Sequence, residues 1–283
     1  MKYFTRLLAV ILISTALVSG TSALASATGG TWAPNPSHNL GSDGALVYSP
    51  ACSTAPTSVR CTQYVLSRIN QARATLHEMP MVLPTNWYHL TIAEQLLVVV
   101  NLERLGYHYP PYLGLNGALT HAALTGARRY TDPVVSTGLA RAILFGGGAW
   151  AGGILTNVLA ADYGWMYDDG WGGSRATTWN IACTGPRAPG CWGHRDGLLG
   201  WSASLSSGPG FWCTTCVMGA AYAPVGRGSQ AVLVAAMVGA TPPLYFTWAQ
   251  ETRFFPRGLP AVITPPPPPP PTTTVPGGSL GLN

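Results

Sequence analysis

The residues best suited to chemistry in this chain surround His194, which directly follows Gly193 and stands at the start of a short apolar helix. An imidazole changes its charge near neutral pH, so it can act as an acid, a base or a metal ligand. We interpret His194 as a site residue. The alternative is that it only begins a helix and bonds to nearby backbone.

Six cysteines form three couples that are close in sequence. The couples are Cys52 with Cys61, Cys183 with Cys191, and Cys213 with Cys216. In an oxidising compartment such couples become disulfides, and a bridge between the second pair would fix the direction of His194. The Cys-x-x-Cys spacing of the third couple also occurs in redox and zinc motifs. Because no second such motif accompanies it, we interpret this couple as a structural disulfide.

Two other motifs have part of a known chemical site but lack its remaining residues. Asp168 and Asp169 are paired as in calcium or acid–base sites, but no further acidic residues follow at the spacing of a calcium-binding loop. The glycine run at 146–148 is not followed by the Lys-Ser/Thr pair of a phosphate-binding loop. We therefore expect residues 134–155 to form a glycine-rich loop beside a cleft.

The beginning of the chain predicts export. A basic stretch at residues 1–6 precedes an apolar run at 7–18 and a small-x-small pattern at 23–27, which is the layout of a secretory signal peptide. The apolar run is shorter than the ~20 residues that span a bilayer. We expect residues 1–25 to be removed, no transmembrane segment, and a secreted, extracellular monomer, free or associated with the cell wall.

Charge and composition argue against a nucleic-acid partner. Lys and Arg number 15 against 10 Asp and Glu, and the arginines are scattered rather than clustered. Ten Trp and twelve Tyr in a chain with 9% charged residues favour contacts with an uncharged partner, because aromatic rings give contact area without charge. The expected ligand is a small apolar molecule, a glycan or a peptide.

Hydrophobic periodicity predicts helices followed by strands. Helices are expected over 61–79, 91–106, 116–130 and 157–169, the second opened by a Thr91–Glu94 capping box and ended by Gly106. Strand-like runs follow at 216–223, 230–238 and 245–250. This order predicts an α+β fold, an α-β-α sandwich with a small antiparallel sheet between helices.

The domain is expected at residues 58–255. Residues 26–57 are rich in Gly, Ser, Pro and Asn and should be extended, whereas residues 256–283 contain seven consecutive prolines and should form a stiff tail. Inside the domain, we interpret Glu103 and Arg104 as a charge pair at the solvated end of their helix.

Several motifs occur in a characteristic order along the domain. They are Asn101–Arg104 with Gly106 and Pro110–Pro111, Leu119 with Ala123 and Ala127, Trp165–Asp168, Gly193–Arg195 with Leu198–Leu199, and Val217–Ala220. Over residues 62 to 250 this order resembles the CAP superfamily of cysteine-rich secretory and pathogenesis-related proteins, in particular its bacterial SCP-like branch. The resemblance implies an α-β-α sandwich whose cleft holds two His and two acidic residues, often with zinc.

The resemblance carries half of that cleft over to this chain. His194 matches the second family His, and Asp168 replaces the family glutamate. Gly126 stands where the first His is expected, and Trp150–Ala151 where the family has Glu-Asn. A closed zinc site is therefore not expected, and His194 with Asp168 would bind a divalent metal only weakly. The implied degenerate cleft consists of Trp150, Asp168, Trp192 and His194.

Three functions are compatible with these residues. The first, which we favour, is a secreted binding or interaction module. The second is a peptidase-like hydrolase in which Asp168 orients His194 as general base; it lacks a Gly-x-Ser-x-Gly motif, and the serines at 202, 204 and 206 are near His194 only in sequence. The third is a cell-wall-associated structural protein with the proline tail as spacer. No residue is assigned as catalytic beyond the candidates His194 and Asp168.

Overall fold

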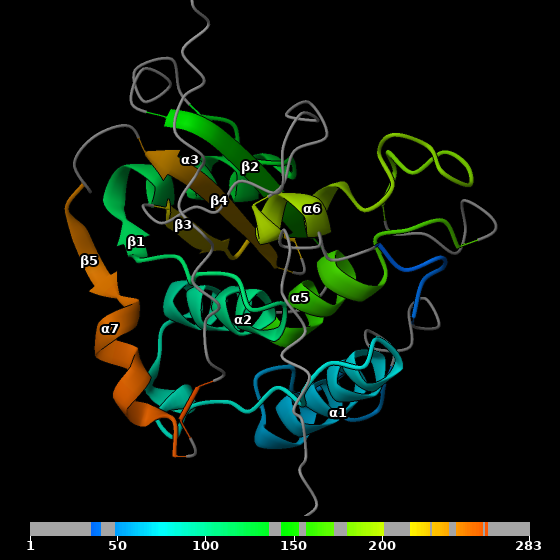
Figure 1. Ribbon diagram of the computed structural model, residues 1–283, viewed down its shortest axis with the longest axis horizontal. Helices are drawn as coiled ribbons and strands as arrows, with labels where there is room; N and C mark the ends of the chain where they lie inside the picture. The colour runs from blue at the N-terminus through cyan, green and yellow to red at the C-terminus, as the bar shows by residue number, and fades with distance from the viewer. Residues whose placement is uncertain are drawn as a thin grey trace, which may run out of the picture.

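The protein is shown in Figure 1 as a computed structural model. The structure describes residues 35–40, 49–135, 143–152, 157–172, 180–200, 216–226, 228–237, 242–256 and 258–259. The predicted signal peptide, most of the proline-rich tail and the serines at 202–206 lie outside these ranges.

The first three predicted helices begin at residues that cap them. Ser58 caps α1 (Val59–Thr75), the predicted Thr91–Glu94 capping box opens α2 (Ile92–Gly106), and Asn116 caps α3 (Gly117–Arg129). In each case a side-chain oxygen accepts a hydrogen bond from an amide that the helix itself leaves without a partner. The local sequence therefore sets where these helices start.

Helix α2 is buried along most of its length, as its apolar sequence predicts, but its end differs from the prediction. Glu103 and Arg104 are only 0% and 1% exposed, so the expected solvated charge pair is wrong. Two further helices, α5 (Val158–Tyr167) and α6 (Gly193–Leu199), pack against α2. The C-cap of α2 is Tyr107 rather than the predicted Gly106.

The described strands form one mixed sheet in the order β2-β4-β3-β1-β5. They are β1 (Gly114–Asn116), β2 (Ile143–Gly152), β3 (Cys216–Ala223), β4 (Ser229–Met237) and β5 (Leu244–Thr247). The predicted β3–β4 hairpin is confirmed. The sheet is not purely antiparallel, because β1 pairs in parallel with β3 and antiparallel with β5. A strand as short as β1 leaves no periodic signal in the sequence.

The glycine-rich stretch that we predicted to be a loop is strand β2 at one end of the sheet. It pairs antiparallel with β4, from Ile143 opposite Met237 to Gly152 opposite Ser229. Glycine has little preference for strands, so pairing with the apolar β4 produces this strand against its local sequence. At Gly148 a side chain is excluded, because a Cβ would lie 2.4 Å from the Pro133 carbonyl oxygen.

Alternate residues of β3 and β4 belong to separate apolar clusters, which they form with different helices. One set packs into the main core with residues of α2 and α5: Met218, Ala220, Val232 and Val234. The intervening set packs on α3: Val217, Ala221, Ala223, Ala231, Leu233 and Ala235. This period of two, with helices on both faces, confirms the predicted α-β-α arrangement.

The remaining elements are short. A 3₁₀ turn at Trp87–His89 precedes α2, and β5 leads directly into α7 (Trp248–Glu251) and a 3₁₀ turn at Thr252–Phe254. The predicted strand at 245–250 is thus half strand and half helix. Among the described residues, no helix has the length and apolarity needed to cross a membrane.

Candidate functional site

The short helix α6, which carries His194, is held at its C-terminal end by Arg104 of α2 and by Tyr112, which follows that helix. The Arg104 guanidinium donates to the Leu199 carbonyl at 2.5 Å, and the Tyr112 hydroxyl donates to the Leu198 carbonyl at 2.9 Å. A helix leaves its last carbonyls without intrahelical partners, and a cation beside them also suits the helix dipole. Arg104, which we expected in solvent, therefore helps to position the helix of the site.

A buried ionic network supports α6 from the side of the core. It consists of Arg73, Glu78, Glu103, Tyr107, Tyr167 and Arg195. Arg73 pairs with Glu103 at 2.7 Å, and Glu103 also accepts from the Tyr167 hydroxyl at 2.7 Å. Arg195 donates to the hydroxyl of Tyr107, which in turn donates to Glu78. The buried Asp162 carboxyl also interacts with Glu103 and with both arginines, so two arginines face three acidic side chains. Burial and the charge of Glu103 raise the pKa of Asp162 well above its usual range.

His194 lies between two carboxylates. Its Nδ1 is 2.6 Å from Asp169 Oδ1, its backbone amide donates to Asp169 Oδ2 at 2.9 Å, and its Nε2 is 3.3 Å from Asp132 Oδ1. The Asp169 side chain is 1% exposed, whereas that of Asp132 is 51% exposed. Asp169 is therefore the fixed partner of the imidazole, and Asp132 is the partner that solvent or a ligand can reach.

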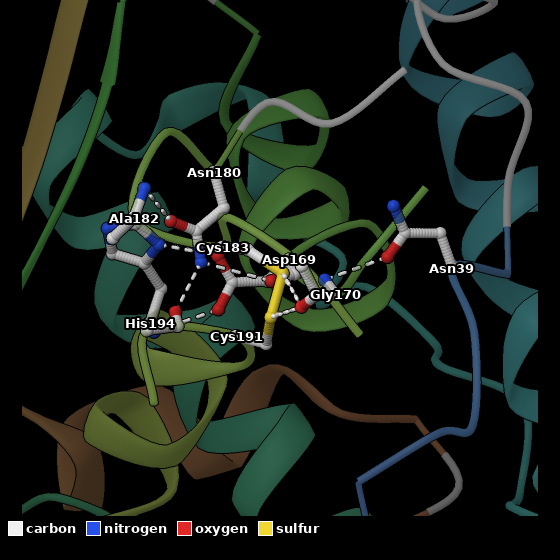
Figure 2. The surroundings of a disulfide bond; sticks show 10 residues. Asn39, Asp169, Gly170, Asn180, Ala182, Cys183, Cys191 and His194 are labelled. Carbon is white, nitrogen blue, oxygen red and sulfur yellow. Dashed lines mark hydrogen bonds and ion pairs between the residues drawn. A yellow bond between two sulfur atoms is a disulfide. The ribbon is translucent and has the colours of Figure 1, made fainter. Parts of the chain in front are cut away.

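The carboxylate beside His194 is not the one that the sequence predicted. We expected Asp168, but His194 contacts Asp169 through both its backbone amide and its ring Nδ1 (Figure 2). Helix α5 ends at Tyr167, and Asp168, its buried C-cap, already has a non-helical φ of −133°. The resemblance matched Asp168, three residues after Trp165, to the family glutamate, but the helix has already ended at this residue. The turn after the helix places the next residue, Asp169, beside His194.

The turn around Asp169 is held by the loop that the second disulfide closes. The Cys183–Cys191 bridge is present as predicted. Beside it, the Asn180 side chain donates to the Asp169 carbonyl at 3.0 Å and to the Gly190 carbonyl at 2.7 Å, and the Trp192 amide donates to the Asp169 carbonyl at 2.9 Å (Figure 2). Asn180 had no motif that would identify it in the sequence.

The first predicted disulfide, Cys52–Cys61, is also present and joins the segment before α1 to the first turn of that helix. Cys216 is disulfide-bonded at the start of β3. Its predicted partner, Cys213, lies outside the described residues. The structure thus confirms the first two of the three predicted couples.

Electrostatics favour a charged His194. Burial alone lowers its pKa, but the charge of Asp169 and the contact with Asp132 outweigh burial and raise the pKa to about 10. Burial raises the pKa of Asp169, opposed by the charge of His194 and by hydrogen bonds from its ring and backbone. At neutral pH the His194 ring is therefore protonated. Such a His donates hydrogen bonds through both ring nitrogens and does not accept a proton.

The imidazolium borders a pocket of about 520 Å³. Its aromatic lining comes from Tyr130, Trp150 and Trp165, and its polar lining includes Asp132 and Asn180. Small residues form much of the remaining wall: Gly148, Ala151 and Gly152 of β2, Ala161 and Gly164 of α5, Ala182 and Gly190 in and beside the disulfide loop, and Gly193 of α6.

Of the four predicted cleft residues, Trp150 and His194 line this pocket. Asp168 and Trp192 are buried, 3% and 7% exposed, and do not belong to its lining. Trp192 instead occupies the N-cap of α6 with a left-handed φ of 65°, where its ring packs against Gly170. The tryptophan therefore shapes the backbone behind His194 rather than the pocket.

Asp132 takes the place opposite His194 that we had matched to Gly126. Gly126 is buried in α3, and a Cβ at that position would lie 2.9 Å from backbone atoms of Thr131 and Pro133. The chain leaves α3 at Tyr130 and brings Asp132 to the Nε2 atom. No motif in the sequence identified Asp132 as a site residue.

The described residues do not fit a closed zinc site. Nε2 of His194 and Oδ1 of Asp132 are near enough to share an ion, but no group of three or more His, Cys, Asp or Glu side chains is placed to hold a metal within the described ranges. A structural zinc site takes four ligands. An ion would also have to displace the proton on Nε2, which lowers its affinity.

The geometry of this site has to be interpreted on its own terms. Comparison of the chain with known proteins found no matching family model, no matching curated protein and no matching solved structure.

Proposed function

We propose that the chain is a secreted binding module, similar to the CAP superfamily, and that its pocket binds a glycan. The observation that carries the proposal is the position of the Asp132–His194 pair at the border of a pocket lined by Tyr130, Trp150 and Trp165. The volume of about 520 Å³ falls within the usual range for small-ligand sites.

The chemistry of the lining favours a hydroxyl-bearing ligand. A sugar hydroxyl both donates and accepts, which suits a half-exposed carboxylate beside an imidazolium N–H. The apolar faces of sugar rings suit aromatic side chains, and Tyr130 is 45% exposed, with its ring edge-on to the Trp150 ring. Export is supported by the two disulfides, which form in oxidising compartments.

The test is a calorimetric titration of the mature protein with soluble oligosaccharides. Loss of a hydrogen bond to a charged group costs about 1.5–3 kcal/mol, so Asp132→Ala should weaken binding by roughly 10- to 100-fold. His121→Ala is the matched control, because His121 is exposed on α3 and is not among the pocket residues. Binding of peptides or apolar compounds in place of sugars would show that the ligand class is wrong.

One observation supports a second function, a hydrolase. Asp169 holds the Nδ1 side of His194, which is how a carboxylate orients a catalytic imidazole. With its pKa raised to about 10, His194 would serve as a general acid at neutral pH rather than as the predicted base. The comparison of wild type with His194→Ala on peptide and ester substrates decides the matter. Equal rates end the hydrolase hypothesis.

Cell-wall association remains a prediction for residues 260–283, which lie outside the described residues. It is tested by comparing how much protein is released into the medium with and without this tail.

A further inference from the structure

The N-terminal segment contacts the site from behind. Asn39 Oδ1 accepts a hydrogen bond from the Gly170 amide at 2.7 Å, and the Leu40 amide donates to the Tyr167 carbonyl at 2.8 Å. Figure 2 shows Asn39 on the other side of the Asp169–Gly170 turn from His194. Pro36 is buried in the same segment. Residues 35–40 are therefore fastened to the turn that presents Asp169.

We propose that residues 35–40, here named the strap, position the Asp169 carboxylate against His194, with Asn39 as the positioning residue. A peptide group is planar, so holding its carbonyl and its amide together fixes the orientation of the plane. The Asp169 carbonyl is held by Asn180 and by the amide of Trp192, and the Gly170 amide of the same peptide is held by Asn39. The domain therefore holds the carbonyl of this peptide, and the strap holds its amide.

Close packing makes the orientation of this peptide matter for α6 as well. A Cβ on Gly170 would lie 2.3 Å from the ring of Trp192, so the turn and the tryptophan leave no free space between them. Trp192 is the N-cap of α6, and His194 lies two residues further along. A shift of the turn would therefore move both partners of the 2.6 Å contact between Asp169 and His194.

The contacts of Asn39 show which atom does the positioning. Its Oδ1 accepts from Gly170, whereas its Nδ2 has no hydrogen-bond partner among the described residues. An aspartate at this position keeps the acceptor, and a leucine keeps the approximate size of the side chain but removes the acceptor. If Asn39 acts through its acceptor atom, the aspartate variant should behave like the wild type and the leucine variant should not. A residue that only fills space would not give this order.

The experiment is an NMR titration of the His194 ring in the full mature chain. Asn39→Leu should lower the pKa of His194 by about one unit, a tenfold change in its protonation equilibrium, because the Asp169 carboxylate is no longer held against the ring. Asn39→Asp should leave the pKa at or above the wild-type value. His38→Ala is the matched control, since this exposed neighbour contacts only Ser37 among the described hydrogen bonds.

An unchanged pKa in Asn39→Leu, with or without a lower melting temperature, overturns the proposal, and so does a pKa that falls equally in Asn39→Asp. Asn39→Ala, a smaller change, replaces the leucine variant if that variant does not fold. The inference rests on the proposed function only for its second readout, weaker glycan binding in Asn39→Leu. Wild-type protein that binds no glycan contradicts the proposed function, whereas the ring titration judges the strap alone.

Discussion

Arg195 and Tyr107 connect the helix that carries His194 to the buried ionic network. The Arg195 guanidinium lies over the Tyr107 ring, 5.0 Å from its centroid, and donates to its hydroxyl. The preceding residue on the same helix, His194, borders the pocket. Two consecutive residues of α6 thus belong to different parts of the protein, one to the core and one to the site.

Replacement of Arg195 should therefore destabilise the whole domain. Arg195→Met removes a buried cation and leaves Glu78 with less compensation, a change that typically costs about 3–5 kcal/mol. Urea unfolding measures this loss. Arg60→Met, at an exposed position of α1, should change the free energy of unfolding by no more than about 0.5 kcal/mol. Similar losses in both variants would show that the buried ionic network does not support α6.

The second disulfide should stabilise both the fold and the site. Replacing Cys183 and Cys191 together by serine opens a loop of sequence separation 8, and closing so short a loop is worth about 2.5 kcal/mol. Because this loop holds Asp169, the pKa of His194 should fall as well. Serines at Cys52 and Cys61 are the control. They should lower the melting temperature without moving the His194 titration, and a shift of equal size in both variants would contradict this.

The titration of His194 should be displaced far above that of an ordinary histidine. The ring should stay protonated from pH 5 to pH 8 and titrate near its raised pKa of about 10. Asp169→Asn should lower this pKa more than Asp132→Asn, because Asp169 is buried and Asp132 is half exposed. The measurement is the chemical shift of the ring against pH, and equal shifts in the two variants would disprove the ranking.

This raised pKa also predicts a sign for stability. The folded state binds the His194 proton more tightly than the unfolded state, whose pKa is near 6.5. The stabilisation is complete below pH 6.5 and is lost as the pH rises towards 10. Melting temperatures of His194→Gln should lack this part of the pH dependence, and an identical alkaline profile in both proteins would refute it.

Glu78 should produce a pH dependence of the same sign in the acid range. Burial, reinforced by the charge of Glu103, raises its pKa from 4.5 to about 7. Between these values the unfolded state has released this proton and the folded state has kept it, so stability falls as the pH rises, by up to about 3 kcal/mol. In Glu78→Gln, unfolding free energies measured from pH 4.5 to 7 should show a flatter profile. A profile as steep as that of the wild type would exclude Glu78 as its source.

The parts of the structure that were predictable from sequence are those set by local contacts. Thr91 and Glu94 cap α2 whatever the rest of the chain does, and the apolar alternation of β3 and β4 identifies a hairpin. Strand β2 could not be identified, because its glycines become a strand only through pairing with β4. Glu103 was placed in solvent because its partner Arg73 is 30 residues away in sequence.

His194 and Trp150 could be predicted from the sequence as site residues, but the residues that contact His194 could not. Asp169 was displaced from the expected Asp168 by one residue, because a helix end cannot be located to that accuracy from sequence. Asp132 and Asn180 come from separate segments that meet only in the folded chain. Tertiary contacts, rather than motifs, therefore determine which residues surround the imidazole.

The strand order also has a consequence for the rate at which this protein folds. Only the β3–β4 pair joins neighbouring segments, whereas β2 must find β4, and β1 must find both β3 and β5, across long stretches of chain. High contact order of this kind slows folding. The two disulfides whose cysteines both lie in the described ranges span only 9 and 8 residues, so each can close before the sheet assembles. These two bridges therefore do not speed the slow step, which is the pairing of strands that lie far apart in the sequence.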